Sequence, residues 1–148
     1  MKIAVSTWSF HRNIKKGLNH FEIPDLISGF QVKALEIVED LLPKKELSYL
    51  NKLRQKAEKA GVKIICLAVS NDFTLKNEGK RKNEIAKVRT SFARAKALGA
   101  RLIRIFAGKN TDEKAVERLI KSIKELLPTA KEEKLTLVLE NHGGISED

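Results

Sequence analysis

The chain has 148 residues, of which 42% are hydrophobic and 32% are charged, a balance that excludes an intrinsically disordered protein. No apolar run approaches the ~20 residues of a membrane-spanning helix, and the apolar stretch at the N-terminus is too short for a signal peptide. The single cysteine, Cys66, excludes an intrachain disulfide and lies in an apolar run, which predicts a buried thiol in a reducing compartment. These features predict a cytoplasmic protein with a single domain over residues 1–148.

The net charge of +10 makes nucleic-acid binding an alternative. Between Lys80 and Lys96, however, the basic residues alternate with apolar ones such as Ile85, Val88 and Phe92 at helical spacing. We therefore expect these charges to cover the solvated outer face of an amphipathic helix. Phe92 is the single aromatic residue among them, and no helix-turn-helix or zinc-finger spacing is present, so nucleic-acid binding is the less favoured interpretation.

Five short apolar runs predict β-strands. Each is rich in branched side chains and continuous rather than alternating, as in parallel strands that are buried on both faces. The runs cover residues 3–6, 34–38, 64–69, 102–106 and 136–140.

Helical spacing of apolar residues fills the intervals between these runs. The predicted helices lie within residues 21–30, 47–60, 85–95 and 116–127. A loop over residues 13–19 precedes the first of them. Pro128 should kink or break the last helix near Leu127, because proline cannot donate the hydrogen bond that continues a helix. Residues 129–133 should form a final turn or two.

The starts of successive strands are 30 to 38 residues apart, a spacing that predicts an α/β fold with a parallel sheet and right-handed crossovers. A doubly wound sheet of five strands would be complete at this length. A parallel (β/α) barrel needs eight units and ~250 residues, so the chain would form an incomplete barrel of about five strands and four helices. The sequence has no P-loop and no G-x-G-x-x-G motif after the first strand, and their absence weakens the doubly wound alternative.

Polar or aromatic residues follow every predicted strand, at the sheet edge where parallel α/β proteins bind their ligands. Aromatic faces, hydroxyls and amides at this edge favour a carbohydrate-sized pocket. The candidate substrate-binding residues are Trp8, Phe10, His11, Asn71, Phe106 and His142. The alternative for His142 is that it caps a loop.

Segments at all five strand ends resemble the sugar-phosphate isomerase/epimerase family of xylose isomerase-like TIM barrels. They are Ser6-Thr7-Trp8-Ser9-Phe10-His11-Arg12, Ala34-Leu35-Glu36-Ile37, Val69-Ser70-Asn71-Asp72-Phe73, Arg104-Ile105-Phe106-Ala107-Gly108 and Leu139-Glu140-Asn141-His142-Gly143-Gly144. The last is the most specific. The resemblance covers essentially the whole chain and implies the N-terminal part of such a barrel.

This resemblance implies a metal-dependent isomerase or epimerase acting on a sugar or sugar phosphate. A divalent ion (Mn, Mg, Co or Zn) would polarise the substrate oxygens while a carboxylate moves a proton through an enediolate. By resemblance, Glu140 is both a metal ligand and the catalytic carboxylate; a helix cap or a solvated carboxylate is the alternative. The family's other ligands follow strands six to eight, beyond Asp148. We therefore expect an incomplete metal site and no complete reaction by this chain alone.

Two other functions remain open. A non-catalytic half-barrel would expose its outermost strands, residues 3–6 and 136–140, and this predicts binding to a partner or a homodimer. A DNA-repair enzyme of the endonuclease IV type shares the barrel and the glutamate after strand five. Its zinc site would require histidines after strands two and three, where this chain has Glu39-Asp40 and Asn71-Asp72.

Overall fold

The computed structural model describes residues 3–146, and the chain divides into two compact units. The first unit contains residues 3–68 and 93–101, and the second contains residues 69–92 and 102–146. That residues 1–148 form a single domain remains a prediction. No helix within residues 3–146 combines the length and apolar character needed to cross a bilayer.

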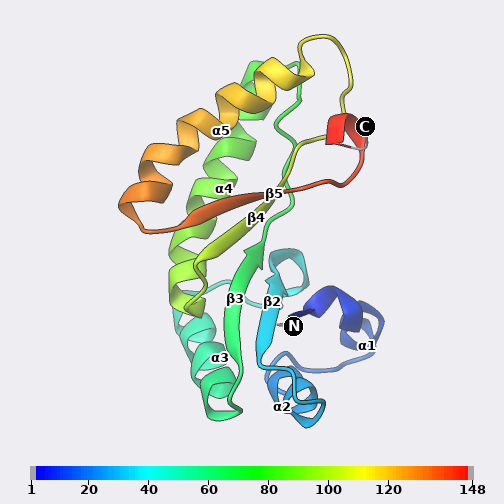
Figure 1. The fold of residues 1–148 in the computed structure, drawn as a ribbon, viewed down its shortest axis with the longest axis vertical. Helices are drawn as coiled ribbons and strands as arrows, with labels where there is room; N and C mark the ends of the chain where they lie inside the picture. The colour runs from blue at the N-terminus through cyan, green and yellow to red at the C-terminus, as the bar shows by residue number, and fades with distance from the viewer. Residues whose placement is uncertain (1–2, 147–148) are drawn as a thin grey trace. The chain divides into compact units, whose positions relative to one another are not determined.

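The first unit is built on three parallel strands (Figure 1). β2 (Ala34–Val38) pairs with β1 (Val5–Ser6) on one side and with β3 (Lys63–Ala68) on the other. Its helices are α1 (His11–Lys15), α2 (Ile23–Gly29) and α3 (Leu47–Lys59). α3 packs against β3 and α2 through the fully buried stripe Leu50, Leu53 and Ala57, as the apolar spacing predicts.

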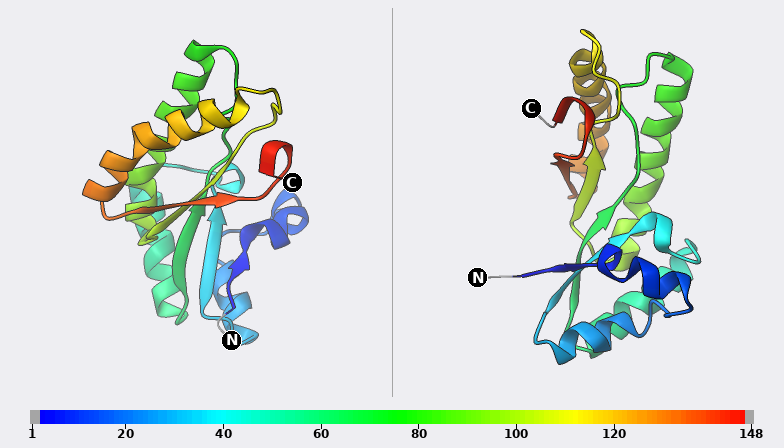
Figure 2. Two further views of the ribbon diagram at one scale, coloured as in Figure 1. Left: turned by 45° about the horizontal axis from the view of Figure 1, so that its top comes forward. Right: turned by 90° about the vertical axis from the view of Figure 1, so that its right-hand side faces the viewer.

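The second unit contains the parallel pair β4 (Leu102–Phe106) and β5 (Thr136–Glu140), whose five residues are aligned one to one. α5 (Ala115–Glu132) packs against β5, as the two views of Figure 2 show. α4 (Glu78–Leu98) starts in this unit and ends in the first.

The predicted fold class is confirmed: five parallel strands with flanking helices form an α/β fold of the barrel type. β2, β4 and β5 have the predicted bounds, and β3 covers residues 63–68 instead of the predicted 64–69. The first strand was predicted too long: β1 covers only residues 5–6 of the expected 3–6. One expectation about the extent of the helices was wrong, because residues 13–15 belong to α1 rather than to a loop. α5 runs through Pro128 without a break, and residues 129–132 form its last turn, close to the turn expected over residues 129–133. Buried Leu126 and Ala130 hold α5 on both sides of the proline, which removes a single intrahelical donor.

The basic residues of α4 are not all on a solvated face, so that expectation was also wrong. Arg81 is buried and its Nη1 donates to the Leu75 carbonyl oxygen at 3.0 Å. Lys87 is half-buried, and Arg94 pairs with the buried carboxylate of Glu39 at 2.9 Å. Long side chains lay their methylenes on apolar surface and reach distant polar groups, which helical periodicity does not reveal.

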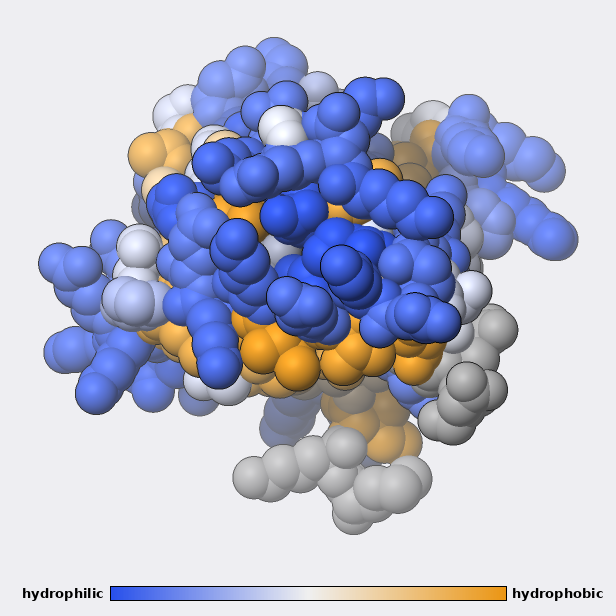
Figure 3. Space-filling view, turned by 90° about the horizontal axis from the view of Figure 1, so that it is seen from above, coloured by the Kyte–Doolittle hydropathy of each residue, from blue (hydrophilic) through white to orange (hydrophobic). Residues whose placement is uncertain are grey.

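Hydrophilic side chains cover most of the face shown in Figure 3, with a band of hydrophobic atoms along its lower side. Large apolar side chains are exposed in both units. In the second unit they are Val116, Ile120 and Leu127 on α5 and Leu139 on β5.

Candidate functional site

The loop after β3, residues 69–77, runs beside β4 within the second unit. The backbone N–H of Val69 donates to the Arg104 carbonyl oxygen at 2.9 Å, and that of Phe73 donates to the Ala107 carbonyl oxygen at 3.1 Å. Between them, the Asn71 side chain accepts from the Phe106 N–H at 2.9 Å and donates to the Phe106 carbonyl oxygen at 2.8 Å. The Asn71 amide thus continues the backbone ladder and fixes the end of β4.

Two glycines allow the loops after β3, β4 and β5 to pack closely. Asp72 Oδ1 accepts hydrogen bonds from the Thr74 N–H at 2.9 Å and the Thr74 hydroxyl at 2.7 Å. This turn lies against Gly108, whose φ is +133° and where an added Cβ would collide with both residues. Gly144, with φ +60°, lies in the same way against the Gly108 carbonyl oxygen. Glycine is required at both positions, because of the space as well as the backbone conformation.

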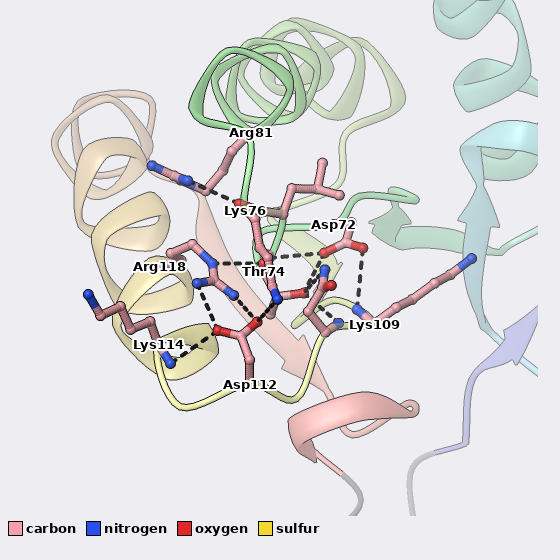
Figure 4. A network of polar contacts seen from close by, with 10 residues as sticks. Asp72, Thr74, Lys76, Arg81, Lys109, Asp112, Lys114 and Arg118 are labelled. Atoms are coloured by element: carbon pink, nitrogen blue, oxygen red, sulfur yellow. Dashed lines mark hydrogen bonds and ion pairs between the residues drawn. The ribbon is translucent and has the colours of Figure 1, made fainter.

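A polar network extends from this turn to the start of α5 (Figure 4). The Thr74 hydroxyl oxygen accepts from the Asn110 N–H at 2.9 Å, and the Thr74 carbonyl oxygen accepts from Arg118 Nε at 2.8 Å. Arg118 also donates to both carboxylate oxygens of Asp112, at 3.1 and 2.6 Å. These hydrogen bonds hold the pKa of the Asp112 carboxyl below its ordinary value. The network therefore fixes the loops that follow β3 and β4 to each other.

These loops enclose one side of a cavity of about 530 Å³ in the second unit. Its lining residues come from the loop after β3, from α4, from the end of β4 and from the turn after β5. They are Ser70, Asn71, Asp72, Glu84, Lys87, Phe106, Gly108, Lys109, His142, Gly143 and Gly144. The volume is that of a small-molecule site, and the wall combines ammonium, carboxylate, amide, imidazole and phenyl groups.

Strand-end reasoning missed Lys109 and the helix residues Glu84 and Lys87 of this wall. Lys87 Nζ donates to the Ser70 carbonyl oxygen at 2.5 Å, and Glu84 Oε2 accepts from the Asp72 N–H at 3.3 Å. Both residues lie on one face of α4, because they are three positions apart. That spacing is the only signal in the sequence, and it does not distinguish them from other charged pairs on the helix.

Beside the cavity, β4 and β5 bring together four side chains. Arg104 Nη1 forms an ion pair with Glu140 Oε2, and the guanidinium carbon lies 5.0 Å from the centroid of the Phe106 ring. The ring of His142 lies 5.0 Å from that of Phe106, and its Nδ1 is 3.8 Å from Glu140 Oε1. We refer to Arg104, Phe106, Glu140 and His142 as the β4–β5 cluster.

The structure thus brings four of the seven predicted site residues together in the second unit: Asn71, Phe106, Glu140 and His142. Trp8, Phe10 and His11 belong to the first unit. There the Trp8 and His11 rings stack with their centroids 4.8 Å apart, and His11 Nδ1 is 2.8 Å from the Trp8 carbonyl oxygen. The side chain of Trp8 is exposed. The substrate-binding roles of all these residues remain predictions.

The residues that the structure describes do not fit a resident metal ion. Within 3–146 there is no group of three or more histidine, cysteine, aspartate or glutamate side chains placed to hold one. Glu140, the ligand implied by resemblance, has one carboxylate oxygen paired with Arg104. Catalytic metal sites usually have three protein ligands.

Parallel strands followed by helices, with a polar cavity at the strand ends, define the class of (β/α) barrel proteins. Residues 25–147 match the family of xylose isomerase-like TIM barrels, and the chain belongs to this family. The resemblance inferred from the strand ends is therefore confirmed. A search of the curated proteins gave no match.

Solved structures with the same fold include several sugar-converting enzymes. D-psicose 3-epimerase from Clostridium cellulolyticum H10 has a TM-score of 0.77 and 18% identity over 94% of this chain and 52% of its own. 3-Keto-D-glucoside 4-epimerase from E. coli has a TM-score of 0.74 and 15% identity over 94% and 55%. A probable 3-DHS dehydratase of petrobactin synthesis from Bacillus anthracis has a TM-score of 0.79 and 16% identity over 97% and 53%. This chain spans about half the length of these proteins.

Proposed function

We propose that the chain provides part of the active site of a sugar or sugar-phosphate isomerase or epimerase. The observation that carries this proposal is the 530 Å³ cavity at the ends of successive strands in a member of this family. Its wall offers hydrogen-bond donors and acceptors to sugar hydroxyls, and the Phe106 and His142 rings offer apolar faces. Asn71 retains one amide hydrogen for a ligand beyond its bond to Phe106.

In this proposal, Glu140 moves the proton between neighbouring sugar carbons. It lies next to the cavity wall, with Oε1 3.8 Å from His142 Nδ1. Lys87 directs its ammonium group to the Ser70 carbonyl oxygen in the same wall and retains two further N–H donors. A cation at this position stabilises the negative charge that an enediolate develops. The substrate-binding roles predicted for Trp8, Phe10 and His11 of the first unit are kept as separate proposals.

Solvent deuterium exchange tests the proton transfer. The full chain is incubated in D2O, at high concentration, with a panel of ketoses, aldoses and their phosphates, and the sugars are examined by NMR. We expect deuterium to appear on the carbon next to the carbonyl of at least one sugar, even where net isomerisation is not completed. Glu140→Gln should abolish the exchange, whereas Glu113→Gln, which alters an exposed loop carboxylate of the same unit, should not. Exchange that persists in Glu140→Gln would refute the assigned role.

A second candidate function, self-association, is favoured by the outer face of α5. Val116, Ile120 and Leu127 are each about half exposed, and their spacing of four and seven places them on one face of the helix. Glu117 flanks this stripe near the N-terminal end of α5, and Lys124 and Lys131 flank it near the C-terminal end. Two copies of α5 that pack antiparallel would therefore bury the stripe and place opposite charges together. We propose a homodimer through this face.

A further inference from the structure

The carboxylate of Glu140 is held by a cation from the neighbouring strand. In the β4–β5 register, Phe106 lies opposite Glu140, and Arg104 lies opposite Val138. Arg104 and Phe106 are two positions apart, so both project from the same face of the sheet as Glu140. The Arg104 side chain crosses this face diagonally, and its Nη1 forms the ion pair with Glu140 Oε2.

Arg104 is fixed in this position by more than its charge. Its side chain is 18% exposed and that of Glu140 is 32% exposed, so bulk water screens the pair only partly. The guanidinium also lies over the Phe106 ring, 5.0 Å from the centroid, at the distance of a cation–π contact. Two independent contacts thus orient the same planar group.

The other oxygen of Glu140 faces His142, whose Nδ1 is 3.8 Å away. A divalent cation binding at Glu140 would share the carboxylate with a guanidinium that Phe106 and the sheet hold in place. The cation and the guanidinium would then be close neighbours on one carboxylate, and two positive charges repel strongly at short range in a partly buried site. The metal-binding role that the family resemblance implies for Glu140 therefore conflicts with its surroundings in this chain.

We infer that Arg104 is the positioning residue of Glu140. Its ion pair orients the Glu140 carboxylate, and its positive charge prevents divalent cations from binding there. The positive charge beside Glu140 is in this chain a side chain rather than a metal ion. Binding of divalent cations to Glu140 can be measured without any catalysis, so its test is independent of the proposed isomerase activity.

Paramagnetic broadening by Mn²⁺ tests this inference, because it detects weak binding residue by residue. MnCl2 is added to the isotopically labelled full chain, and the amide signals of residues 139–143 are followed. We expect no Glu140-dependent broadening in the wild-type chain. Arg104→Met should raise the Mn²⁺ affinity at these residues at least about tenfold, and adding Glu140→Gln should abolish this gain. Arg104→Lys keeps the charge and should behave like the wild type.

Two results would overturn the inference. One is broadening of these amides in the wild-type chain that disappears in Glu140→Gln, since Glu140 would then be open to the ion. The other is an Arg104→Met variant, shown by its amide spectrum to be folded, that binds Mn²⁺ no better than the wild type. If Arg104→Met does not fold, Arg104→Gln, which also removes the positive charge, takes its place and should show the same Glu140-dependent gain in Mn²⁺ affinity.

Discussion

At the scale of single residues, His20 is a buried ionisable group in the first unit. It is 2% exposed, and its Nε2 has no hydrogen-bond partner among the described residues. Burial lowers the pKa of this imidazole from its ordinary value of 6.5, because the charged form loses its hydration. In the pH range between the two values, the unfolded chain therefore binds a proton that the folded chain does not.

We predict that the free energy of unfolding falls as the pH decreases from 7 through 6.5 and levels off below the folded-state pKa. His20→Leu should remove this contribution to the pH dependence, because the unfolded variant no longer takes up a proton at position 20. Urea unfolding at a series of pH values, in the wild type and the variant, measures both slopes. Equal slopes in the two proteins would show that His20 is protonated in the folded chain as readily as in the unfolded one.

Gly108→Ala should destabilise the chain by about 2–4 kcal/mol, because the new methyl group meets Asp72 and Thr74 in an unfavourable backbone conformation. Gly61→Ala is the matched control: its φ is +73° but nothing lies within 4 Å of the added Cβ. We expect it to cost about 1 kcal/mol. Thermal unfolding of both variants compares the two effects, and equal losses would contradict the close packing of the loops.

Residue types at strand ends could be predicted from the sequence, but their contacts could not. Asn71, Phe106 and His142 line the cavity as the strand-end reasoning predicted. The Asn71 amide, however, donates one hydrogen bond to the Phe106 backbone and accepts one from it, a role that no sequence spacing indicates. The requirement for glycine at position 108 likewise depends on a turn from another loop, 34 to 36 positions earlier in the chain.

At the scale of elements, an ion pair attaches the C-terminal part of α4 to the end of β2. The Glu39 side chain is fully buried, and its Oε1 is 2.9 Å from Arg94 Nη1. Arg94→Met should lower the free energy of unfolding by about 3 kcal/mol, because it removes a cation beside a buried carboxylate. Combining it with Glu39→Leu should recover much of this loss. Denaturant unfolding of the three variants completes the cycle, and a double variant as unstable as both losses combined would refute the pairing.

The strands were predictable because each is a continuous apolar run. In β2, β3 and β4 these runs supply core residues such as Leu35, Leu67 and Ile103, whereas β5 is only partly buried. The apolar stripes of the helices were predictable, but two expectations failed: residues 13–15 belong to α1, and the basic residues of α4 are not all solvated. α5 continues through Pro128, since tertiary packing of Leu126 and Ala130 outweighs the lost hydrogen bond. Arg94 lies among solvated charges in sequence, but its length lets it reach a buried partner that is 55 positions away.

At the scale of the whole molecule, the proposed homodimer predicts a mass in solution of twice the 16.7 kDa of the chain. Ile120→Asp places a charge in the middle of the α5 stripe and should give a monomer. Phe30→Asp alters a more exposed apolar side chain, in the first unit, and should leave the dimer intact. Sedimentation equilibrium distinguishes these states. A wild-type monomer, or a dimer unaffected by Ile120→Asp, would rule out this interface.

The family was recognisable because its strand-end segments recur in order along the chain, and the match over residues 25–147 confirms it. The ion-pair partner of Glu140 could not be predicted from the sequence. Resemblance assigns this residue a metal, whereas the register of β4 and β5 gives it a guanidinium. Ligand chemistry therefore depends on which side chains the register places side by side, and the strand-end motifs do not contain this information.

The loops after β3, β4 and β5 form the proposed sugar site in the second unit. Its most direct test is to titrate the labelled full chain with a ketohexose and with its phosphate while following the backbone amide signals. We predict concerted shifts at Asn71, Lys109 and Gly143, which Phe106→Ala abolishes and Phe30→Ala leaves unchanged. The absence of shifts at saturating sugar, or shifts confined to the first unit, would show that the second unit does not contain the proposed sugar site.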